Sequence, residues 1–532
     1  MHKTFRTPFL ATIRKAFKLA LRAEQQQTSA AEVIGQAAEA AMSRRRFLES
    51  TGKTMLGSAL LPGLLFPSSK SLLRPFLGGV APRIAIIGGG IAGLNALHHL
   101  KKNNLEATVY EASGRTGGRM FTVQEAMGKG TWTEFGGEFI DTNHADMWAL
   151  AREFDIELID YAQSSETALQ TEAFFFEGRH RTLEETVTAF RSFAPRMAAD
   201  MEKLDVDISY ASEDPFVKKL DNYSLSKYLK KAGARGWIKR FIEVAYESEY
   251  GLSPKVQSSL NLTLLISPDT SHGHIALFGE SDERYKVRGG NQRIPDALAK
   301  KYADHIVLNS PLESLRQEGE RYRLHFGGSS EDVIADFVIL ALPFSILRQL
   351  DMPIEMPEVK RKCIDEIGYG TNAKLMLGMK SHFWRKQGFG SLVYSDNGIN
   401  NGWDNAQLQT GLDEAAGLSI LFGGPSGVKV GEGSVASQKD KYLPLWEQIY
   451  KGASEQFNGK MMRMHWPSYK YNLGSYTCYT RGQFTSISGA EQLPVGNIFF
   501  AGEHCGGEFA GFMNGAAKSG REAAEGILRL LD

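Results

Sequence analysis

Residues 83–111 set the narrowest limit on how this chain of 532 residues can fold. Residues 83–87 form a short apolar run rich in β-branched side chains, which predicts a buried parallel strand. The sequence GGGIAG follows at residues 88–93, and residues 94–100 continue as a helix. A second strand-like run, residues 107–110, ends at Glu111. This order of strand, turn, helix, strand and acid predicts a parallel α/β sheet that binds a dinucleotide at its first turn.

Each position of that turn has a physical role. Gly88 allows the tight turn, Gly90 lets the backbone approach a pyrophosphate, and Gly93 lets the helix pack closely on the sheet. The free N–H groups at the start of the helix attract phosphate. Glu111 lies where an acid accepts hydrogen bonds from ribose hydroxyls. The residues predicted to bind the cofactor in this unit are Gly88, Gly90, Ile91, Ala92, Gly93, Glu111 and Ala112.

Length and composition require several domains and exclude some classes of site. A chain of this length exceeds one simple core, so two or three domains are expected. Lys and Arg together number 61, as do Asp and Glu, and this balance argues against nucleic acid as a partner. The three cysteines, at positions 363, 478 and 505, form no CxxC pair, and the 12 histidines show no ligand spacing. We therefore expect neither a disulfide framework nor a metal site.

The N-terminal residues resemble an export signal. Residues 43–48 read SRRRFL, which resembles the twin-arginine signal, and the apolar run at 55–66 is short for a membrane span. We expect residues 1–80 to be a leader read by the twin-arginine translocase, a route that carries folded proteins, and the protein to be periplasmic or secreted. No clean Ala-x-Ala cleavage site is present, so an uncleaved membrane tether stays open, and Met42 is an alternative start to Met1.

A second glycine-arginine motif, RTGGR, follows Glu111 at residues 115–119. It resembles the second flavin motif of the flavin-containing amine oxidase family. That family includes monoamine and polyamine oxidases, L-amino acid oxidases and tryptophan monooxygenase. The resemblance implies that Gly118 brings the backbone near a flavin and that Arg115 and Arg119 face its phosphate and ribityl parts.

Further segments resemble the same family as far as the C-terminus. The sequence EFGGEF at 134–139 is similar to its flavin-facing turn, RGGNQ at 288–292 to its central glycine motif, and VILALP at 338–343 to a strand of the flavin domain. The sequence NIFFAGE at 497–503 resembles a strand ending in an acid that bonds the ribityl chain, and FAGFMNGA at 509–516 resembles the start of a final helix facing the flavin. The resemblance adds Gly136, Gly137, Glu138, Val307 (near the adenine), Gly502, Glu503, Gly511, Phe512 and Met513 to the expected FAD contacts.

The resemblance also implies a catalytic group. Lys374 matches the lysine that family members hold by water near flavin N5, where it handles dioxygen or water at the reduced flavin. Trp466 and Tyr476 resemble the segment leading into an aromatic cage, and Phe512 takes the place of the second tyrosine of monoamine oxidases. Ser475 stands where mammalian-type monoamine oxidases attach flavin through cysteine, so the FAD is expected to be non-covalent.

The substrate is less defined by the sequence. Phe139 stands where L-amino acid oxidases of the snake-venom type place an arginine that grips the carboxylate. Either the substrate lacks a carboxylate or another residue holds it. Glu249 is a candidate for the substrate cavity, where an acid suits a basic substrate, although a solvated helix end explains it equally well.

The expected architecture is α/β, with a Rossmann-like FAD domain of the glutathione-reductase type interleaved with a substrate domain. Residues 83–145, 283–345 and 475–532 are expected to form the FAD domain, residues 146–282 a helical cap, and residues 346–474 a substrate-binding sheet.

The expected reaction is oxidation of a primary amine or L-amino acid to an imine, which water hydrolyses to a carbonyl product and ammonia. The electrons are expected to pass to dioxygen, which gives hydrogen peroxide, or to another acceptor. The protein is expected to be a homodimer. Two alternatives keep this fold: a desaturase or porphyrinogen-oxidase-like flavoenzyme, and a non-enzymatic escort protein similar to those of prenylated GTPases, which lacks FAD.

Overall fold

The computed structural model describes residues 81–162, 169–204, 207–271, 277–279 and 281–531. The predicted leader at residues 1–80, with its twin-arginine-like segment, lies outside the described residues. No helix in the described part of the chain is both long and apolar enough to cross a membrane.

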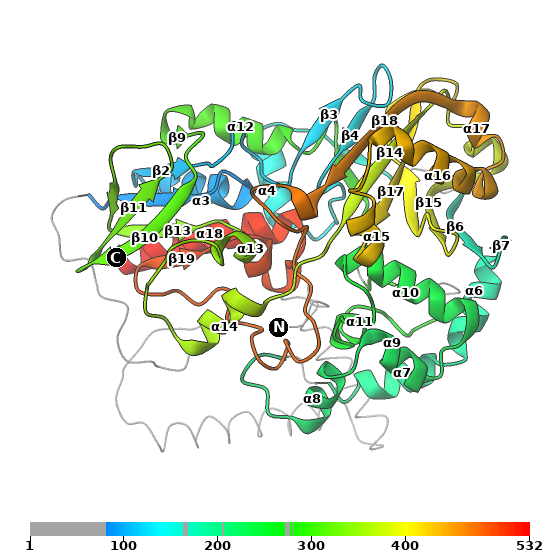
Figure 1. Ribbon diagram of the computed structural model, residues 1–532, viewed down its shortest axis with the longest axis horizontal. Helices are drawn as coiled ribbons and strands as arrows, with labels where there is room; N and C mark the ends of the chain where they lie inside the picture. The colour runs from blue at the N-terminus through cyan, green and yellow to red at the C-terminus, as the bar shows by residue number, and fades with distance from the viewer. Residues whose placement is uncertain (1–80, 163–168, 205–206, 272–276, 280, 532) are drawn as a thin grey trace, which may run out of the picture. The chain divides into compact units, whose positions relative to one another are not determined.

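A five-stranded parallel sheet stands where the glycine-rich motif predicts one (Figure 1). Its order is β19-β13-β1-β2-β9, so segments far apart in the sequence become neighbours. The strands are β1 (Ile84–Ile87), β2 (Ala107–Tyr110), β9 (Ile306–Val307), β13 (Phe337–Leu340) and β19 (Ile498–Phe500). Every residue of the paired strands β1 and β13 is buried, as expected for a parallel sheet covered on both faces.

Helices α3 (Ile91–Lys102) and α18 (Met513–Leu531) pack tightly against each other beside this sheet. A Cβ on Gly520 would lie 2.0 Å from the carbonyl oxygen of Ala92, so only glycine permits this approach of the two helices. Helix α4 (Ala145–Glu153) also joins α18, through an ion pair of 2.7 Å between Asp146 and Arg521. Helix α12 (Arg293–Lys301) and the turn η1 (Ala303–His305) lead into β9.

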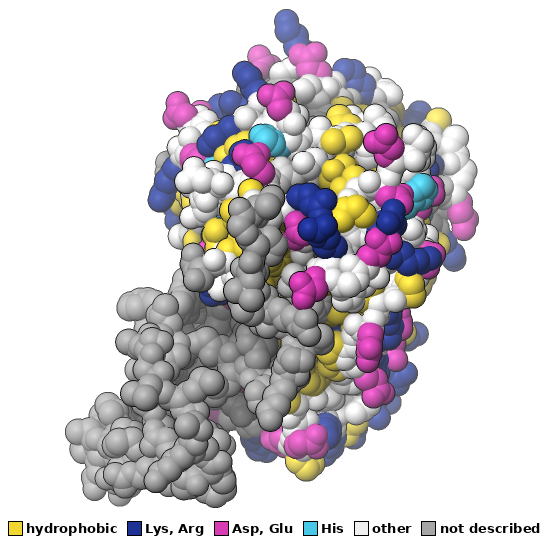
Figure 2. Space-filling model, turned by 90° about the vertical axis from the view of Figure 1, so that its left-hand side faces the viewer, with side chains coloured by type: hydrophobic (Ala, Val, Ile, Leu, Met, Phe, Trp, Pro, Cys, Tyr) yellow, Lys and Arg dark blue, Asp and Glu magenta, His cyan; other side chains and the backbone are white. Residues whose placement is uncertain are grey.

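Smaller sheets flank the parallel sheet. Strands β10 (Leu312–Glu318), β11 (Arg321–Phe326) and β12 (Val333–Ala335) form an antiparallel sheet. The antiparallel pairs are β3 (Thr122–Gln124) with β4 (Trp132–Glu134), and β5 (Leu158–Asp160) with β8 (Tyr285–Val287). On the molecular face seen in Figure 2, basic and acidic side chains are interspersed rather than gathered by sign, in keeping with the balanced charge.

A second large sheet has seven strands in the order β18-β14-β17-β16-β15-β6-β7. Its strands are β6 (Gln170–Phe176), β7 (Arg179–Arg181), β14 (Ala373–Met379), β15 (Phe389–Ser395), β16 (Asn401–Asp404), β17 (Ala416–Phe422) and β18 (Phe457–His465). Helices α15 (Gly424–Lys429), α16 (Val435–Ile449) and α17 (Ala453–Gln456) accompany it. All of β14 is buried, and it carries Lys374.

The remaining helices gather below this sheet in Figure 1. They are α6 (Leu183–Arg191), α7 (Ala194–Met201), α8 (Pro215–Asp221), α9 (Leu225–Ala232), α10 (Gly236–Tyr250) and α11 (Leu260–Thr263). Glycines in the left-handed conformation at positions 233 and 251 end α9 and α10. Short connecting elements are α13 (Phe344–Leu347), α14 (Glu358–Glu366), η2 (Arg385–Gln387), η3 (Trp466–Ser468), η4 (Glu503–Cys505) and η5 (Gly507–Phe509).

The prediction of a helical cap over residues 146–282 needs correction in two places. Residues 170–181 are strands of the seven-stranded sheet, because the aromatic run Phe174–Phe176 favours an extended chain and is buried there. Helix α4 packs on α18, so it belongs with the parallel sheet and not with the helices of the cap.

Candidate active site

The turn between β1 and α3 leaves open space in front of Gly90. Within 4 Å, a Cβ on Gly90 would meet only the Cα of Gly118, at 3.9 Å. Gly93 is enclosed by contrast, because a Cβ there would lie 2.0 Å from the carbonyl oxygen of Gly88. Helix α3 starts at Ile91 with no side-chain cap on its first N–H groups. An uncapped helix start beside open space fits the pyrophosphate of a dinucleotide.

Glu111 stands at the end of β2 and is tied to this turn. Its carboxylate accepts hydrogen bonds from the N–H of Gly89 at 2.7 Å and from the N–H and hydroxyl of Ser113 at 2.8 and 2.7 Å. Its own N–H donates to the carbonyl of Val307 at 2.8 Å. Glu111, the partly exposed Ala112 and the exposed Val307 therefore lie together at the carboxyl ends of β2 and β9, as the sequence predicts.

The loop at residues 115–119 closes over the same turn. The N–H of Gly117 donates to the carbonyl of Gly89 at 2.9 Å. The guanidinium of Arg115 donates to the carbonyl of Thr116 at 3.0 Å and lies 4.0 Å from the ring centre of Phe121. Arg115 therefore shapes the loop itself, in addition to any contact with a phosphate.

Arg119 joins the loop to the C-terminal motif. It pairs with Glu503 at 3.0 Å, and the other carboxylate oxygen of Glu503 accepts from the hydroxyl of Thr477 at 2.9 Å and the N–H of Gly511 at 3.0 Å. Burial alone would raise the pKa of Glu503, but Arg119 and the other donors outweigh it and lower that pKa. The preceding residue, Gly502, has a φ of 140° that favours glycine.

The turn at residues 134–139 is held from two sides. The side chain of Asn291 donates to the carbonyls of Gly137 at 2.9 Å and Glu138 at 2.8 Å, and its backbone N–H donates to the Glu134 carboxyl at 2.7 Å. A Cβ on Gly137 would lie 2.7 Å from the side chain of Met513, the first residue of α18. The motif around Asn291 thus fixes the turn at 134–139 against the final helix.

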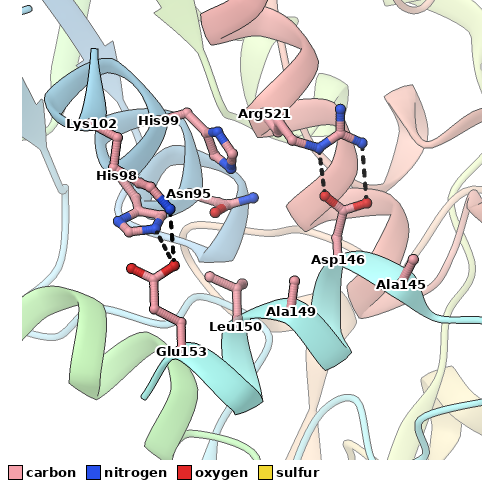
Figure 3. A pocket seen from close by; sticks show the side chains of 10 residues that line it. All are labelled: Asn95, His98, His99, Lys102, Ala145, Asp146, Ala149, Leu150, Glu153 and Arg521. Carbon is pink, nitrogen blue, oxygen red and sulfur yellow. Dashed lines mark hydrogen bonds and ion pairs between the residues drawn. The ribbon is translucent and has the colours of Figure 1, made fainter.

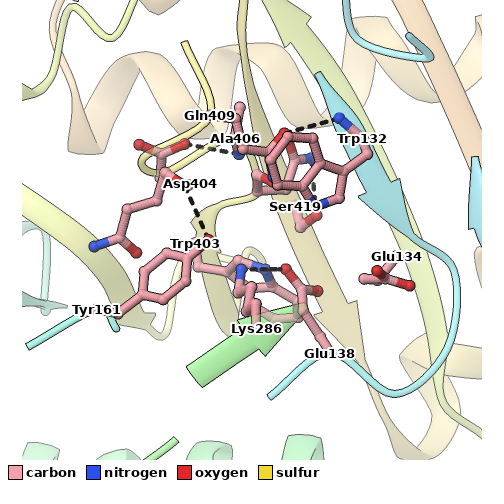
Figure 4. A network of polar contacts seen from close by, with 12 residues as sticks. Trp132, Glu134, Glu138, Tyr161, Lys286, Trp403, Asp404, Ala406, Gln409 and Ser419 are labelled. Carbon is pink, nitrogen blue, oxygen red and sulfur yellow. Dashed lines mark hydrogen bonds and ion pairs between the residues drawn. The ribbon is translucent and has the colours of Figure 1, made fainter. Parts of the chain in front are cut away.

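Glu138 lies at the centre of a buried ionic cluster (Figure 4). Its carboxylate accepts from Lys286 at 2.6 Å, from Lys374 at 2.9 Å and from the indole N–H of Trp403 at 2.9 Å. Burial would raise the pKa of Glu138, but the two lysines outweigh it and lower that pKa to about 2. Glu138 is therefore a carboxylate at every working pH.

Lys374 is anchored directly to the turn. In addition to Glu138, its ammonium donates to the backbone carbonyls of Glu134 at 3.1 Å and Gly136 at 2.8 Å. The sequence predicted Lys374 as a site residue near the flavin, but it indicated neither its anchoring to this turn nor Lys286 and Trp403 as its neighbours. A lysine inside the short strand β8, directly before the glycine motif at 288–292, was the available signal for Lys286.

Tyr476 and Phe512 occupy neighbouring positions. A Cβ on Gly511 would lie 3.9 Å from Cδ2 of Tyr476, so this ring lies beside the backbone that leads into Phe512. The hydroxyl of Tyr476 donates to the carbonyl of Ser248 at 3.3 Å, and the ring of Phe512 lies 5.2 Å from that of His144. Both aromatic side chains stay partly exposed, as the walls of a substrate cage require.

Trp466 has a supporting position. It is buried in an apolar cluster that includes Phe135 and Met376, and its indole N–H donates to the carbonyl of Phe135 at 3.0 Å. A Cβ on Gly136 would lie 3.3 Å from the Trp466 ring. Its described contacts therefore support the turn at 134–139.

Carboxyl groups lie near Tyr476. Burial raises the pKa of Tyr476, and the carboxylates of Glu249 and Glu283 raise it further. The pKa of Glu283 rises to about 8, first through burial and then through Glu249 and other nearby carboxylates. Phe139 stacks under the Lys286 ammonium at 4.4 Å instead of presenting a cation to a substrate. The acidic side chains Glu249 and Glu283 therefore lie within electrostatic reach of Tyr476.

A separate pocket of about 270 Å³ lies between α3, α4 and α18 (Figure 3). It is crossed at one end by the Asp146–Arg521 pair and bounded at the other by His98, whose ring lies 3.1 Å from Glu153. None of the residues predicted for cofactor, substrate or catalysis lines it.

The comparisons with known proteins agree with this geometry. The model of a family described as flavin containing amine oxidoreductase matches residues 91–528. An L-amino acid dehydrogenase of Synechocystis is 24% identical over 88% of this chain and 100% of its own length. A flavin-containing amine oxidase of Danio rerio is 23% identical over 84% of this chain and 85% of its own. The solved structure of a putrescine oxidase bound to putrescine superposes with a TM-score of 0.72 at 19% identity, over 84% of this chain and 99% of that one. The predicted fold class, with an FAD domain interleaved with a substrate domain, is confirmed.

Proposed function

The chain belongs to the flavin containing amine oxidoreductase family, and we propose that it oxidises a primary amine or an L-amino acid to an imine. It is an oxidoreductase with FAD as its cofactor, and the open cradle at Gly90 and the uncapped start of α3 fit that group. In the proposed reaction the amine loses two electrons and two protons. Water then hydrolyses the imine to a carbonyl product and ammonia, and dioxygen or another acceptor takes the electrons.

The position of Tyr476 beside Gly511, the residue that precedes Phe512, carries this proposal. When bound, FAD accepts the hydride equivalent, so the protein chiefly has to hold and orient the amine. Two aromatic faces can flank the neutral nitrogen and exclude water from it. The turn at 134–139 and the start of α18 fix the cofactor's surroundings from the other side.

Ammonia release distinguishes this reaction from the desaturase alternative. Purified enzyme supplied with an amine and a dye acceptor should release ammonia in equal amount to the dye reduced. Dye reduction without ammonia would favour a desaturase or a porphyrinogen-oxidase-like reaction. A colourless protein that binds no FAD would favour the escort protein.

We further propose that the substrate carries a second cationic group. Glu249 and Glu283 raise the pKa of Tyr476, and Glu249 also raises that of Glu283, so a cation bound beside them would favour the ionised form of both carboxyl groups. Phe139 offers no grip for a carboxylate, since it stacks on Lys286. A diamine or a basic amino acid fits these charges, and the structural relative bound to putrescine, a diamine, is consistent with this choice.

Glu283→Gln should impair a diamine more than a monoamine. We expect KM for putrescine to rise about ten-fold relative to that for butylamine, which corresponds to about 1.4 kcal/mol of lost charge interaction. Steady-state kinetics on both substrates, with Asp282→Asn at the adjacent exposed carboxylate as control, measures this ratio. An equal change for both substrates would remove Glu283 from substrate recognition.

We also propose export through the twin-arginine pathway, on the basis of the sequence SRRRFL at 43–48. An enzyme that loads FAD before export needs a route for folded proteins. Replacing Arg44 and Arg45 with lysine should retain the protein in the cytoplasm, as seen by cell fractionation and immunoblotting. Unchanged periplasmic or secreted protein would rule out this signal, and replacing Arg74 instead provides a control outside the motif.

A further inference from the structure

The ammonium of Lys374 has no N–H left for other partners in its observed position. An ammonium group carries three donors. Lys374 directs them to the carbonyls of Glu134 and Gly136 and to the carboxylate of Glu138, at 3.1, 2.8 and 2.9 Å. Its side chain is 7% exposed, so solvent has little access to it. The lysine that the family resemblance assigns to dioxygen or water at the flavin is thus fully engaged by the protein.

Among the three acceptors of Lys374, Glu138 holds the ammonium most strongly. The ammonium forms charge-assisted bonds to all three acceptors, but only the carboxylate of Glu138 adds the attraction of an opposite full charge. Glu138 is itself held by Lys286 at 2.6 Å and by Trp403 at 2.9 Å, so it cannot turn away from Lys374 without leaving Lys286 unpaired in the interior. We call Glu138, Lys286 and Trp403 the lysine clamp.

We infer that Glu138 is a positioning residue that withholds Lys374 from dioxygen, so that the reduced enzyme reacts slowly with dioxygen. This inference rests on the proposed function, because it assumes that the turn at 134–139 faces the flavin. Reoxidation by dioxygen removes two electrons and two protons from the reduced enzyme and yields hydrogen peroxide. A benzoquinone can remove the same two electrons and two protons to give a hydroquinone, and it does not require the ammonium. The low pKa of Glu138 keeps the clamp closed throughout the working pH range.

The clamp can be opened without changing the buried charge. Glu138→Leu combined with Lys286→Met removes one negative and one positive charge, so the cluster keeps the net positive charge of Lys374. The double variant frees one donor of Lys374 while its two backbone acceptors remain. Lys286→Met alone leaves Glu138 on Lys374 and should gain much less.

The test uses full-length holoenzyme reduced with dithionite, so no amine substrate is required and a wrong substrate assignment cannot affect the result. Stopped-flow mixing with dioxygen, followed at the flavin absorbance band, should show reoxidation at least ten-fold faster in the double variant than in the native enzyme. Adding Lys374→Met to the double variant should cancel that gain. The midpoint potential of the bound flavin should rise in the double variant and fall back in the triple variant, because a freed ammonium stabilises reduced flavin. An FAD-loaded double variant with native dioxygen kinetics and potential would overturn the inference.

The native enzyme provides a second test if the double variant does not fold. Mixed with equal concentrations of dioxygen or benzoquinone, the reduced native enzyme should react at least ten-fold more slowly with dioxygen. Dioxygen reacting as fast as the quinone, or faster, would overturn the inference without any variant. Failure of amines to reduce the flavin would instead overturn the proposed function.

Discussion

Gly90→Val leaves the fold intact and abolishes FAD binding. A Cβ at this position meets no protein atom closer than 3.9 Å, so a side chain can leave the backbone here without a clash at its Cβ in the flavin-free protein. The same side chain enters the space in front of the uncapped N-terminus of α3, where the pyrophosphate has to approach the backbone. Absorbance of the purified protein should fall from about one FAD per chain to almost none, with unchanged circular dichroism.

Gly93→Ala is the matched control for that experiment. Its Cβ would lie 2.0 Å from the carbonyl oxygen of Gly88, so this smaller substitution should damage the protein itself and lower its unfolding temperature. The bound cofactor can be counted after acid precipitation, because Ser475 cannot form a thioether to flavin and FAD is expected in the supernatant. Native FAD content in folded Gly90→Val would show that the cradle is elsewhere.

Glu138→Leu destabilises the flavin-free protein by about 3–5 kcal/mol, the usual cost of removing one partner from a buried ion pair. The Glu138 side chain is 4% exposed, and its loss leaves Lys286 and Lys374 as two buried ammonium groups without this counter-charge. Adding Lys286→Met should recover most of the loss, because only one ammonium then remains and it keeps two backbone acceptors. Chemical denaturation of the flavin-free proteins gives both free energies of unfolding.

An exposed ion pair provides the contrast. Lys386 and Asp413 approach within 2.5 Å, but their side chains are 59% and 79% exposed. Asp413→Leu should therefore change stability little, since solvent screens such pairs. The buried ion pairs would contribute less to stability than their geometry implies if Glu138→Leu changed the free energy of unfolding as little as Asp413→Leu does. The same would follow if Lys286→Met did not restore the stability that Glu138→Leu loses.

The start of the parallel sheet was predictable because residues close together in the sequence form its first two strands and the turn between them. The run at 84–87 is apolar on both faces, the turn needs glycine at defined positions, and Glu111 directly follows the next strand. The order of the five strands was harder to predict, because β13 pairs with β1, and β19 with β13, across long stretches of sequence. The strands at 170–181 were missed because an aromatic run between helical segments gives no sign of which distant sheet it joins.

The contacts within the ionic cluster around Glu138 could not be predicted from the sequence. Glu138 and Lys374 were both predicted site residues, from motifs that lie far apart in the chain, yet nothing in either motif says that they bind each other. Lys286 and Trp403 come from two further strands, and their meeting depends on the packing of β8 and β16. Arg115 and Trp466 likewise carry contacts with the protein that motif resemblance could not supply.

Anaerobic titration of the enzyme tests its proposed function most directly. Oxygen-free protein is mixed in turn with simple monoamines, diamines, neutral L-amino acids and basic L-amino acids, while the visible flavin band is recorded. We predict that amines bleach the band, and that diamines or basic amino acids do so at the lowest concentrations. A yellow protein whose flavin no amine or amino acid reduces would contradict amine oxidation, although it would retain the fold.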